Sequence, residues 1–473
     1  MVSPRPGKAI ADSLGRTTHA SRSEAPLVTL PVLDLSEPHL LLPTSSAATC
    51  RLVTLGCKVN QYETQLVKEG LERHGWREAA EEEPATLCVV NTCTVTSEAD
   101  SKARQVIRQL AKANPGCATI VFGCYATRAA DELARLPGVV EVVADARELP
   151  DVLQRFGVHD WPGGISRFDG HRRAFVKVQD GCLLNCTYCI IPSVRPGLRS
   201  RQPADILSEI QRLVSNGYRE IVLTGIHLGH FGVESTRGRL GVPPYRLWHL
   251  LRDIDQLPGD FRVRLSSLEA AEVGDDFLRV ASECRRLVPH FHLCLQSGSD
   301  QVLARMKRRY RSGRFVEQVR KIRERLHKPA LSTDVIVGFP GETDEDFEQT
   351  LRVCETAEFL KIHAFPFSRR RGTPAHEFFD QVTPEVRQRR MQILRELEAR
   401  LQARYYSQLV GERLQVLVEA RPAQTSGHVT GTACRYVSVE FPGGRSLLGQ
   451  LCSVTVTEVR DGVVLAKQTE SHP

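Results

Sequence analysis

Residues 179–193 read QDGCLLNCTYCIIPS and place Cys182, Cys186 and Cys189 in one short loop. A buried lone cysteine usually packs as a small hydrophobic residue, but the spacing C-x3-C-x2-C brings three thiolates together. Thiolate-only ligation selects zinc or an iron–sulfur cluster. Zinc prefers a fourth ligand close by, and the residues that neighbour the loop in sequence offer no further Cys or His. The stretch therefore indicates a metal site with one open position, as an iron–sulfur cluster on three thiolates would leave it.

The cysteine loop follows the first of six strand-like segments that alternate with helix-like stretches. The segments are RAFVKVQ (173–179), REIVLTG (219–225), FRVRLSSLE (261–269), HFHLCLQSGS (290–299), LSTDVIVGFPG (331–341) and FLKIHAFPFS (359–368). Alternating β and α segments predict an α/β fold with parallel strands. Because six units are fewer than the eight of a closed barrel, we expect an incomplete (βα)6, TIM-like barrel with its site at the carboxyl ends of the strands.

A second α/β pattern precedes this one. The apolar runs CRLVTLGC (50–57), ATLCVVNTC (85–93) and ATIVFGC (118–124) alternate with predicted helices over 61–76 and 97–114, the latter capped by Ser97. Cys57, Cys93 and Cys124 each end one of these runs. In open parallel sheets the carboxyl ends of the strands meet at one edge, where ligands bind. The three cysteines could therefore converge, although they lie far apart in the sequence.

The last part of the chain differs in pattern. A long charged helix is predicted over 383–407, and the following residues alternate with period two between glycine turns, which predicts a small antiparallel β-barrel. The predicted division is a disordered tail (1–48), an N-terminal α/β domain (49–157), a Gly- and Arg-rich linker (158–172), the incomplete barrel (173–405) and the C-terminal β-barrel (406–471).

Composition restricts the class of protein. The chain has 473 residues, 41% hydrophobic and 25% charged, with a formal net charge of +7, which is ordinary for a globular protein of several domains. No apolar run reaches the roughly 20 residues of a membrane span. The 14 cysteines are scattered rather than paired at disulfide-framework spacings, so we expect reduced thiols and a cytoplasmic location. We interpret the following cysteines as core residues: Cys50, Cys88, Cys117, Cys284, Cys294, Cys354, Cys434 and Cys452.

The C-x3-C-x2-C loop after the first barrel strand resembles that of the radical S-adenosylmethionine enzymes, including the aromatic Tyr188 before the last cysteine. The resemblance implies a 4Fe–4S cluster on Cys182, Cys186 and Cys189. Its free iron would hold the amino and carboxylate groups of S-adenosylmethionine. Cleavage of that cosubstrate yields a 5′-deoxyadenosyl radical, so the reactive chemistry belongs to the cofactor.

Seven stretches together resemble the methylthiotransferase family within that superfamily: TLGCKVNQYE, VNTCTVT, FGC, CTYCIIP, LQSGSDQVLARMKRRY, DVIVGFPGETDEDF and FPFSRRRGTPA. The resemblance implies a second 4Fe–4S cluster on Cys57, Cys93 and Cys124, and a C-terminal TRAM domain. TLGCKVNQYE and LTGIHLGHFG are similar to the branch that acts on N6-threonylcarbamoyladenosine at position 37 of tRNA. The implied activity is that of a transferase: radical sulfur insertion and methylation at C2 of this adenosine.

Further site residues follow from strand ends and from the resemblance. Thr224 and Gly225 take the place of the superfamily's GGE stretch, and other strand-end residues would contact the adenosine part of S-adenosylmethionine; each could instead be a turn or packing residue. Asp334 could be a barrel-core or a site residue. No catalytic residue beyond the cluster ligands is assigned. The predicted cosubstrate contacts are Tyr188, Thr224, Gly225, Ser267, Glu269, Gln296, Val337, Gly338, Phe339, Pro340 and Gly341.

Two dense basic runs, 305–314 and 369–371, are candidates for phosphate contacts, because such contacts supply most sequence-independent affinity for RNA. A solvated charged face is the alternative. The predicted RNA-binding residues are Arg305, Lys307, Arg308, Arg309, Arg369, Arg370 and Arg371. The expected partners are a tRNA substrate, a reducing electron donor and a sulfur source, with neither DNA nor a membrane.

Other functions remain open. A methylthiotransferase could act on isopentenyladenosine in tRNA or on a ribosomal-protein side chain. From a different class, the chain could be a zinc- or cluster-bearing RNA-binding module without catalysis. Iron content, cleavage of S-adenosylmethionine and the modified nucleosides of the cell separate these alternatives.

Overall fold

The computed structural model describes residues 48–236 and 243–469. The tail predicted over 1–48 lies outside these ranges except for its last residue, as does the end of the predicted C-terminal domain. In the described ranges no helix is both long and apolar enough to cross a membrane.

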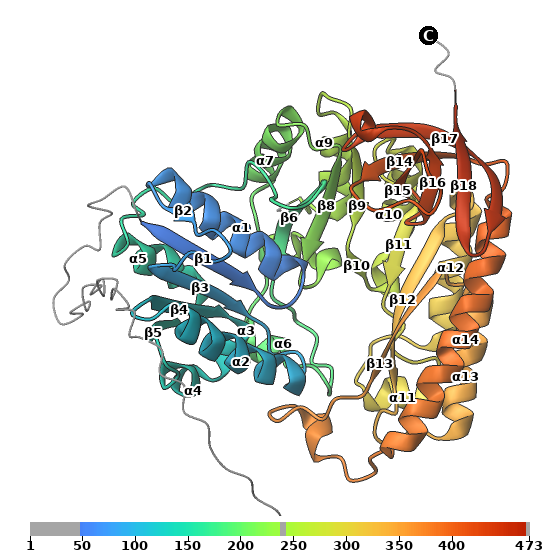
Figure 1. Cartoon of the computed structure of the whole chain (residues 1–473). Helices are drawn as coiled ribbons and strands as arrows, with labels where there is room; N and C mark the ends of the chain where they lie inside the picture. Colours follow the sequence, from blue (N-terminus) through green and yellow to red (C-terminus); the bar gives the residue numbers. More distant parts are fainter. Residues whose placement is uncertain (1–47, 237–242, 470–473) are drawn as a thin grey trace, which may run out of the picture.

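The N-terminal unit is a parallel five-stranded sheet with strand order β2-β1-β3-β4-β5 (Figure 1). Buried apolar residues of β3 and β4 fill its centre. Its strands are β1 (Thr49–Thr54), β2 (Arg77–Glu78), β3 (Leu87–Thr92), β4 (Ala118–Gly123) and β5 (Val139–Val143). Its helices are α1 (Lys58–Arg73), α2 (Ser97–Ala113), α3 (Cys124–Arg128), α4 (Ala130–Ala134) and α5 (Leu149–Gln154).

Two helix boundaries differ from the prediction. Helix α1 begins at Lys58 rather than at 61, because Cys57 is its N-cap with extended backbone. Helix α2 is capped by Thr96 rather than Ser97, and the Thr96 hydroxyl accepts a hydrogen bond from the Ala99 amide at 3.2 Å. A threonine oxygen at this position satisfies an amide that the helix itself leaves unpaired.

The central unit contains the predicted strand segments in chain order. They form two four-stranded sheets, β7-β6-β8-β9 and β10-β11-β12-β13, and the segment predicted over 261–269 is divided between them. The strands are β6 (Arg173–Asp180), β7 (Arg199–Ser200), β8 (Glu220–Gly225), β9 (Arg262–Leu265), β10 (Ser267–Leu268), β11 (His290–Leu293), β12 (Ala330–Val337) and β13 (Lys361–Pro366). The short β7 pairs antiparallel with β6, and the other pairs are parallel.

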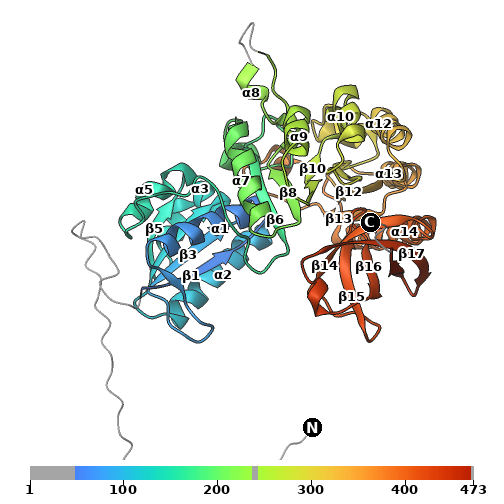
Figure 2. The same cartoon turned by 90° about the horizontal axis from the view of Figure 1, so that it is seen from above.

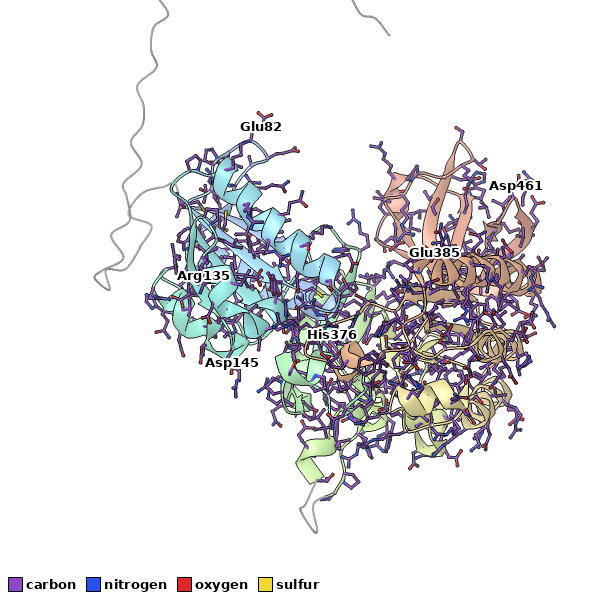
Figure 3. The ribbon with its side chains drawn as sticks, turned by 90° about the horizontal axis from the view of Figure 1, so that it is seen from below. Glu82, Arg135, Asp145, His376, Glu385 and Asp461 are labelled. Atoms are coloured by element: carbon purple, nitrogen blue, oxygen red, sulfur yellow. The ribbon has the colours of Figure 1, made fainter. Side chains whose placement is uncertain are left out.

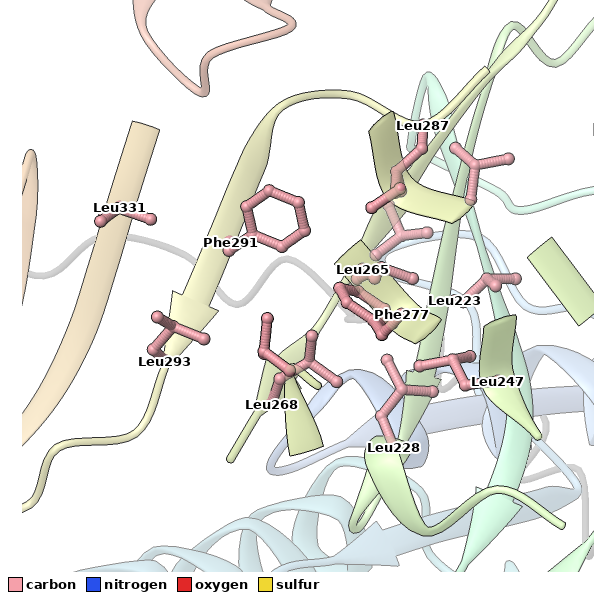
Figure 4. Close-up of a cluster of buried hydrophobic side chains, with 14 of the residues drawn as sticks. Leu223, Leu228, Leu247, Leu265, Leu268, Phe277, Leu287, Phe291, Leu293 and Leu331 are labelled. Atoms are coloured by element: carbon pink, nitrogen blue, oxygen red, sulfur yellow. The ribbon is translucent and has the colours of Figure 1, made fainter. Parts of the chain in front are cut away.

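Helices cover the outside of these sheets (Figure 2). Leucine and phenylalanine side chains from strands and helices form one large core (Figure 4). The helices are α6 (Ile191–Val194), α7 (Pro203–Ser215), α8 (Val233–Thr236), α9 (Leu247–Asp255), α10 (Asp275–Glu283), α11 (Asp300–Arg305), α12 (Ser312–Arg325), α13 (Asp344–Ala357) and α14 (Pro384–Gln408). The long helix α14 is capped by Thr383 and lies beside β13 (Figure 1).

The C-terminal unit is a closed five-stranded barrel of order β14-β15-β16-β18-β17. Its strands are β14 (Arg413–Glu419), β15 (His428–Ala433), β16 (Ser438–Pro442), β17 (Leu451–Arg460) and β18 (Val463–Gln468). The N-terminal unit and this barrel both flank the central unit (Figure 2).

The C-terminal barrel docks on the amino ends of the central strands. Arg262 and Arg264 of β9 donate to the carbonyl oxygens of Thr432 and Ala433 at 2.7 and 3.0 Å. Glu220, the first residue of β8, pairs with both arginines. The carboxyl ends of the central strands, where the cysteine loop lies, are therefore at the opposite end from this contact.

Candidate functional site

The loop with Cys182, Cys186 and Cys189 begins directly after β6. Gly181 is required before it: its φ is +76°, and a Cβ there would lie 1.6 Å from the carbonyl oxygen of Gly197. The Thr187 amide donates to the Met306 carbonyl at 3.1 Å, and its hydroxyl to the Arg305 carbonyl at 2.8 Å. The loop is thus fixed at both its start and its middle.

The thiols of this loop lie close to two basic side chains. The Nδ1 atom of His227 lies 3.3 Å from Sγ of Cys182, and Nη1 of Arg308 lies 3.5 Å from Sγ of Cys186. Arg308 is buried and forms an ion pair with Glu269. The positive charge faces sulfur, which is the environment that stabilises thiolates.

Burial raises the pKa of Cys189 to about 12, and the charges of Cys186 and Cys182 act in the same direction. Cysteine binds a metal as the thiolate, and a metal ion or cluster would neutralise the three negative charges that such a site brings together. The donor set therefore fits a metal group bound by three cysteines.

His227 belongs to a cluster with His230 and Glu272, the cluster lying beside Cys182. The sequence neighbours of the loop offer no histidine, but the fold brings this one in from the end of β8. Burial opposes protonation of His227, but hydrogen bonds to Cys182 and Glu272 raise its pKa to about 10. Burial and the charge of His227 lower the pKa of His230 to about 4. His227 lies two residues after Gly225, so the strand-end signal that selected Thr224 and Gly225 could have found it.

The second set, Cys57, Cys93 and Cys124, lies at one edge of the N-terminal sheet. Thr92 pairs with Gly123 in register, so Cys93 and Cys124 follow neighbouring strand ends. Gly56, with φ +118°, approaches Cys93 so closely that a Cβ there would lie 3.3 Å from the Cys93 Sγ. Burial raises the pKa of Cys93 and of Cys124, and the charges of Cys57 and Cys93, respectively, contribute to these shifts. The fold thus brings the three distant cysteines together.

The two cysteine sets are neighbours. Cys124 packs with Ile190 and Val194, which lie one and five positions after Cys189 in the chain. The Arg195 guanidinium donates to Sγ of Cys124 at 3.2 Å. A cavity of about 210 Å³ also reaches Cys124 and Arg195 from the side of Asp145, which is labelled in Figure 3. Arg195 escaped the sequence analysis, because an arginine in an Arg-rich segment carries no signal of burial.

Of the predicted cosubstrate residues, Tyr188 lies in the cysteine loop after β6. The others occupy the carboxyl ends of β8, β10 and β12 and the loop after β11. Thr224 is buried, Ser267 is exposed, and Glu269 is held by Arg308. Gln296 has a φ of +62°, and its carbonyl oxygen accepts from the Ile336 amide at 2.9 Å. The hydrogen bond to Ile336 therefore links the segment after β11 to β12, with Gln296 in the left-handed region.

At the end of β12 and in the turn after it, the Val337 and Phe339 side chains are buried in apolar clusters. Tyr188 packs edge-on against Phe339 with the ring centroids 6.5 Å apart. Pro340 is buried, and Gly338 and Gly341 have φ values of +70° and +79°. Asp334 is half-buried, and its carboxylate lies 3.1 Å from Nε2 of His292. Within this stretch, Val337 and Phe339 thus have packing side chains, so any contact with a bound molecule falls to the backbone there.

Two of the predicted RNA contacts are wrong. Arg308 is buried in the cysteine site, and Arg370 is buried in an ion pair with Asp100 at 2.6 Å. Neither guanidinium can meet a phosphate at the surface. Arg305 forms an ion pair with Asp380 at 2.6 Å. The remaining predicted residues are exposed: Lys307, Arg309, Arg369 and Arg371.

Comparison with known proteins agrees with this architecture. Residues 49–145 match the model of uncharacterized protein family UPF0004, and residues 176–354 match that of the radical SAM superfamily. The solved structure of the radical S-adenosylmethionine methyltransferase TsrM from Kitasatospora setae, with cobalamin and a 4Fe–4S cluster bound, has a TM-score of 0.50 at 13% identity, covering 70% of this chain and 77% of that chain. That likeness shows the fold alone.

Several curated relatives match over nearly their whole length. The threonylcarbamoyladenosine tRNA methylthiotransferases MtaB of Chlamydia pneumoniae and Bacillus subtilis are 39% and 36% identical, over 87% and 86% of this chain and 96% and 94% of theirs. The tRNA-2-methylthio-N(6)-dimethylallyladenosine synthase of Carboxydothermus hydrogenoformans is 34% identical over 86% of this chain and 96% of its own. With both cysteine sets in place, the chain belongs to the radical S-adenosylmethionine methylthiotransferase family.

Proposed function

We propose that this protein is a tRNA methylthiotransferase that converts N6-threonylcarbamoyladenosine at position 37 into its 2-methylthio derivative. The observation that carries the proposal is the side-by-side placement of two three-cysteine sets at the carboxyl ends of two parallel sheets. Relatives named for this reaction are more similar to the chain than the relative named for dimethylallyladenosine.

The chemistry of the substrate explains why two sets are needed. The C2–H of adenine is not acidic, so acid–base groups alone cannot open this position. We assign one 4Fe–4S cluster to Cys182, Cys186 and Cys189 and a second to Cys57, Cys93 and Cys124. With S-adenosylmethionine bound, the first would supply radical chemistry and the second would present sulfur. The protein's own part is to hold thiols, cosubstrate and base in one arrangement.

His227 and Arg308 support this assignment from outside the ligand set. Each lies at hydrogen-bonding distance from a cysteine sulfur. Each is also held by a carboxylate, Glu272 or Glu269. Such outer contacts orient the ligands of a metal site and tune its charge. His227 is therefore a neighbour of the cluster in this proposal and not a fourth ligand.

We extend the proposal to the architecture of the central and C-terminal units. The six main strands of the central unit correspond to an incomplete, TIM-like (βα)6 barrel, and the C-terminal barrel to a TRAM domain. The domain division is the one predicted from the sequence: 49–157, a linker over 158–172, 173–405 and 406–471. The cosubstrate then lies among Tyr188, Thr224, Gly225, Ser267, Glu269, Gln296 and the 337–341 stretch.

The exposed members of the two basic runs are the proposed contacts to tRNA phosphates. Lys307 and Arg309 flank Arg308, whose side chain contacts Cys186, and Arg369 and Arg371 follow β13, so both pairs lie towards the carboxyl ends of the central strands. Arg305 can join them only by exchanging its partner Asp380. A reducing electron donor and a sulfur source complete the requirements of the reaction.

Mass spectrometry of tRNA nucleosides from cells that lack the gene tests the proposal. We expect 2-methylthio-N6-threonylcarbamoyladenosine to disappear and to return with the wild-type gene but not with Cys182→Ala. If the 2-methylthio derivative of isopentenyladenosine disappears instead, the protein acts on isopentenyladenosine in tRNA. Unchanged nucleosides together with zinc in the purified protein would favour a non-catalytic RNA-binding module.

A further inference from the structure

Arg195 is the residue through which the two cysteine sets touch. It follows the first set by six positions, its side chain is 6% exposed, and Nε donates to Sγ of Cys124 at 3.2 Å. A buried guanidinium is retained only where its charge and its donors have partners. The two terminal nitrogens of the Arg195 guanidinium therefore need hydrogen-bond partners and negative charge inside the protein.

Two carboxylates bind the rest of the guanidinium. Nη1 donates to Glu63 at 2.8 Å and to Asp180 at 3.1 Å, and Nη2 donates to the other Glu63 oxygen at 2.9 Å. Lys177 donates to both carboxylates at 2.6 Å. Two cations and two anions thus form a neutral cluster next to Cys124.

The same hydrogen-bond network continues to the other cysteines. Asp180 accepts from the amide of Gly181, the residue before Cys182, at 2.8 Å. Asn60 accepts weakly from Nη2 of Arg195 at 3.4 Å, and from the Cys57 thiol at 3.4 Å. Its amide group donates to the carbonyl of Thr92, the residue before Cys93, at 3.1 Å. One arginine therefore touches one sulfur directly and is linked to the positions of three further cysteines.

We propose that Arg195 is a positioning residue that fixes the Cys57/Cys93/Cys124 cluster against the Cys182 loop and raises the reduction potential of that cluster. This inference rests on the proposed function, which places the second cluster there. Hydrogen bonds and positive charge at a ligand sulfur stabilise the more negative, reduced state of an iron–sulfur cluster. Within residues 48–236 and 243–469, Lys177 is the other cation paired with Glu63 and Asp180. Without Arg195, two carboxylates and one cation would therefore lie next to Cys124. The potential would then fall.

The experiment isolates the second cluster. The full chain with Cys182, Cys186 and Cys189 changed to Ala is purified anaerobically, its iron is counted, and its midpoint potential is measured by electron paramagnetic resonance during a redox titration. We expect Arg195→Gln in this background to shift the potential downwards. Glu63→Gln keeps the arginine but removes one negative charge, so it should shift the potential upwards.

Arg201→Gln is the matched control. Arg201 also crosses between the two units, since it donates to Tyr62 at 2.9 Å and pairs with Glu209 at 2.5 Å. Among the residues that the structure describes, its partners include no cysteine. This variant should leave the potential unchanged. If Arg195→Gln loads no iron, the Glu63→Gln variant tests the proposal alone: an upward shift of its midpoint potential supports the role of Arg195, and an unchanged or lower potential overturns it.

The results separate the two proposals. No iron in the triple-alanine background would overturn the second cluster, and this inference with it. The role of Arg195 would be overturned if iron is present but neither Arg195→Gln nor Glu63→Gln shifts the potential. It would also be overturned if both variants shift the potential in the same direction. Either result would leave the proposed function intact. Opposite shifts, with Arg201→Gln unshifted, support the role of Arg195.

Discussion

The Nδ1 atom of His227 lies 3.3 Å from Sγ of Cys182, and Glu272 engages the other side of the same imidazole. The contact joins the end of β8 to the loop after β6. It makes His227 the carboxylate-oriented neighbour of a predicted cluster ligand, a relationship that metal sites commonly use to orient their ligands.

His227→Phe should weaken retention of the first cluster by about 10–100-fold, the usual effect of removing such an outer partner. Retention is measured as iron that remains after anaerobic dialysis against a chelator. His230→Phe is the control, because His230 contacts Glu272 at 3.4 Å and stacks on His227. Equal losses in both variants would show that the histidine pair acts through packing alone.

Arg308 and Arg309 are neighbours in sequence, but Arg308 is buried and Arg309 is exposed, so their substitution should impair different properties of the protein. Arg309→Ala should weaken tRNA binding and lower the slope of log affinity against log salt by about one. Arg308→Ala should leave that slope unchanged and abolish cleavage of S-adenosylmethionine, because Arg308 is buried against Cys186 and Glu269. If Arg308→Ala lowers the slope as much as Arg309→Ala does, Arg308 contacts RNA, which would contradict this prediction.

Glu220 should stabilise the contact between the central unit and the C-terminal barrel. Burial opposes its ionisation, but Arg264, Arg262 and Arg173 lower its pKa to about 2. Glu220→Gln leaves buried arginines without their carboxylate, which should reduce the free energy of unfolding by about 3–5 kcal/mol at pH 7. Urea unfolding of the metal-free protein measures this loss.

The pH dependence of that loss has a defined sign. A carboxyl whose folded pKa is lowered contributes stability above its unfolded pKa of 4.5, and this contribution disappears as the pH falls from 4.5 towards 2. The difference between wild type and Glu220→Gln should therefore be smaller at pH 3.5 than at pH 7. A constant difference would mean that the variant acts through lost packing instead.

The sequence predicted the parts of the molecule that local pattern controls. The strand segments and the family were readable, because apolar runs and cysteine spacing are local signals, and the comparisons confirm the family. The convergence of Cys57, Cys93 and Cys124 was accessible through the general geometry of parallel sheets.

What escaped prediction depends on distant partners. Arg370 is buried because Asp100, 270 residues away in the chain, pairs with it. Arg195 meets Cys124 across 71 residues. A basic run shows how many charges a segment carries, but which of them face the interior is decided only when the units pack together.

The proposed reaction requires two clusters that the protein holds separately. Iron and sulfide counting on anaerobically purified Cys93→Ala tests this, with Cys88→Ala as the control, because Cys88 is buried in β3, the strand that Cys93 directly follows, and contacts Cys117. We predict that Cys93→Ala loses about half of the iron, as expected for one of two 4Fe–4S clusters, and still cleaves S-adenosylmethionine, while Cys88→Ala keeps all its iron. Full iron in Cys93→Ala, or loss of both iron and cleavage activity, would contradict the account.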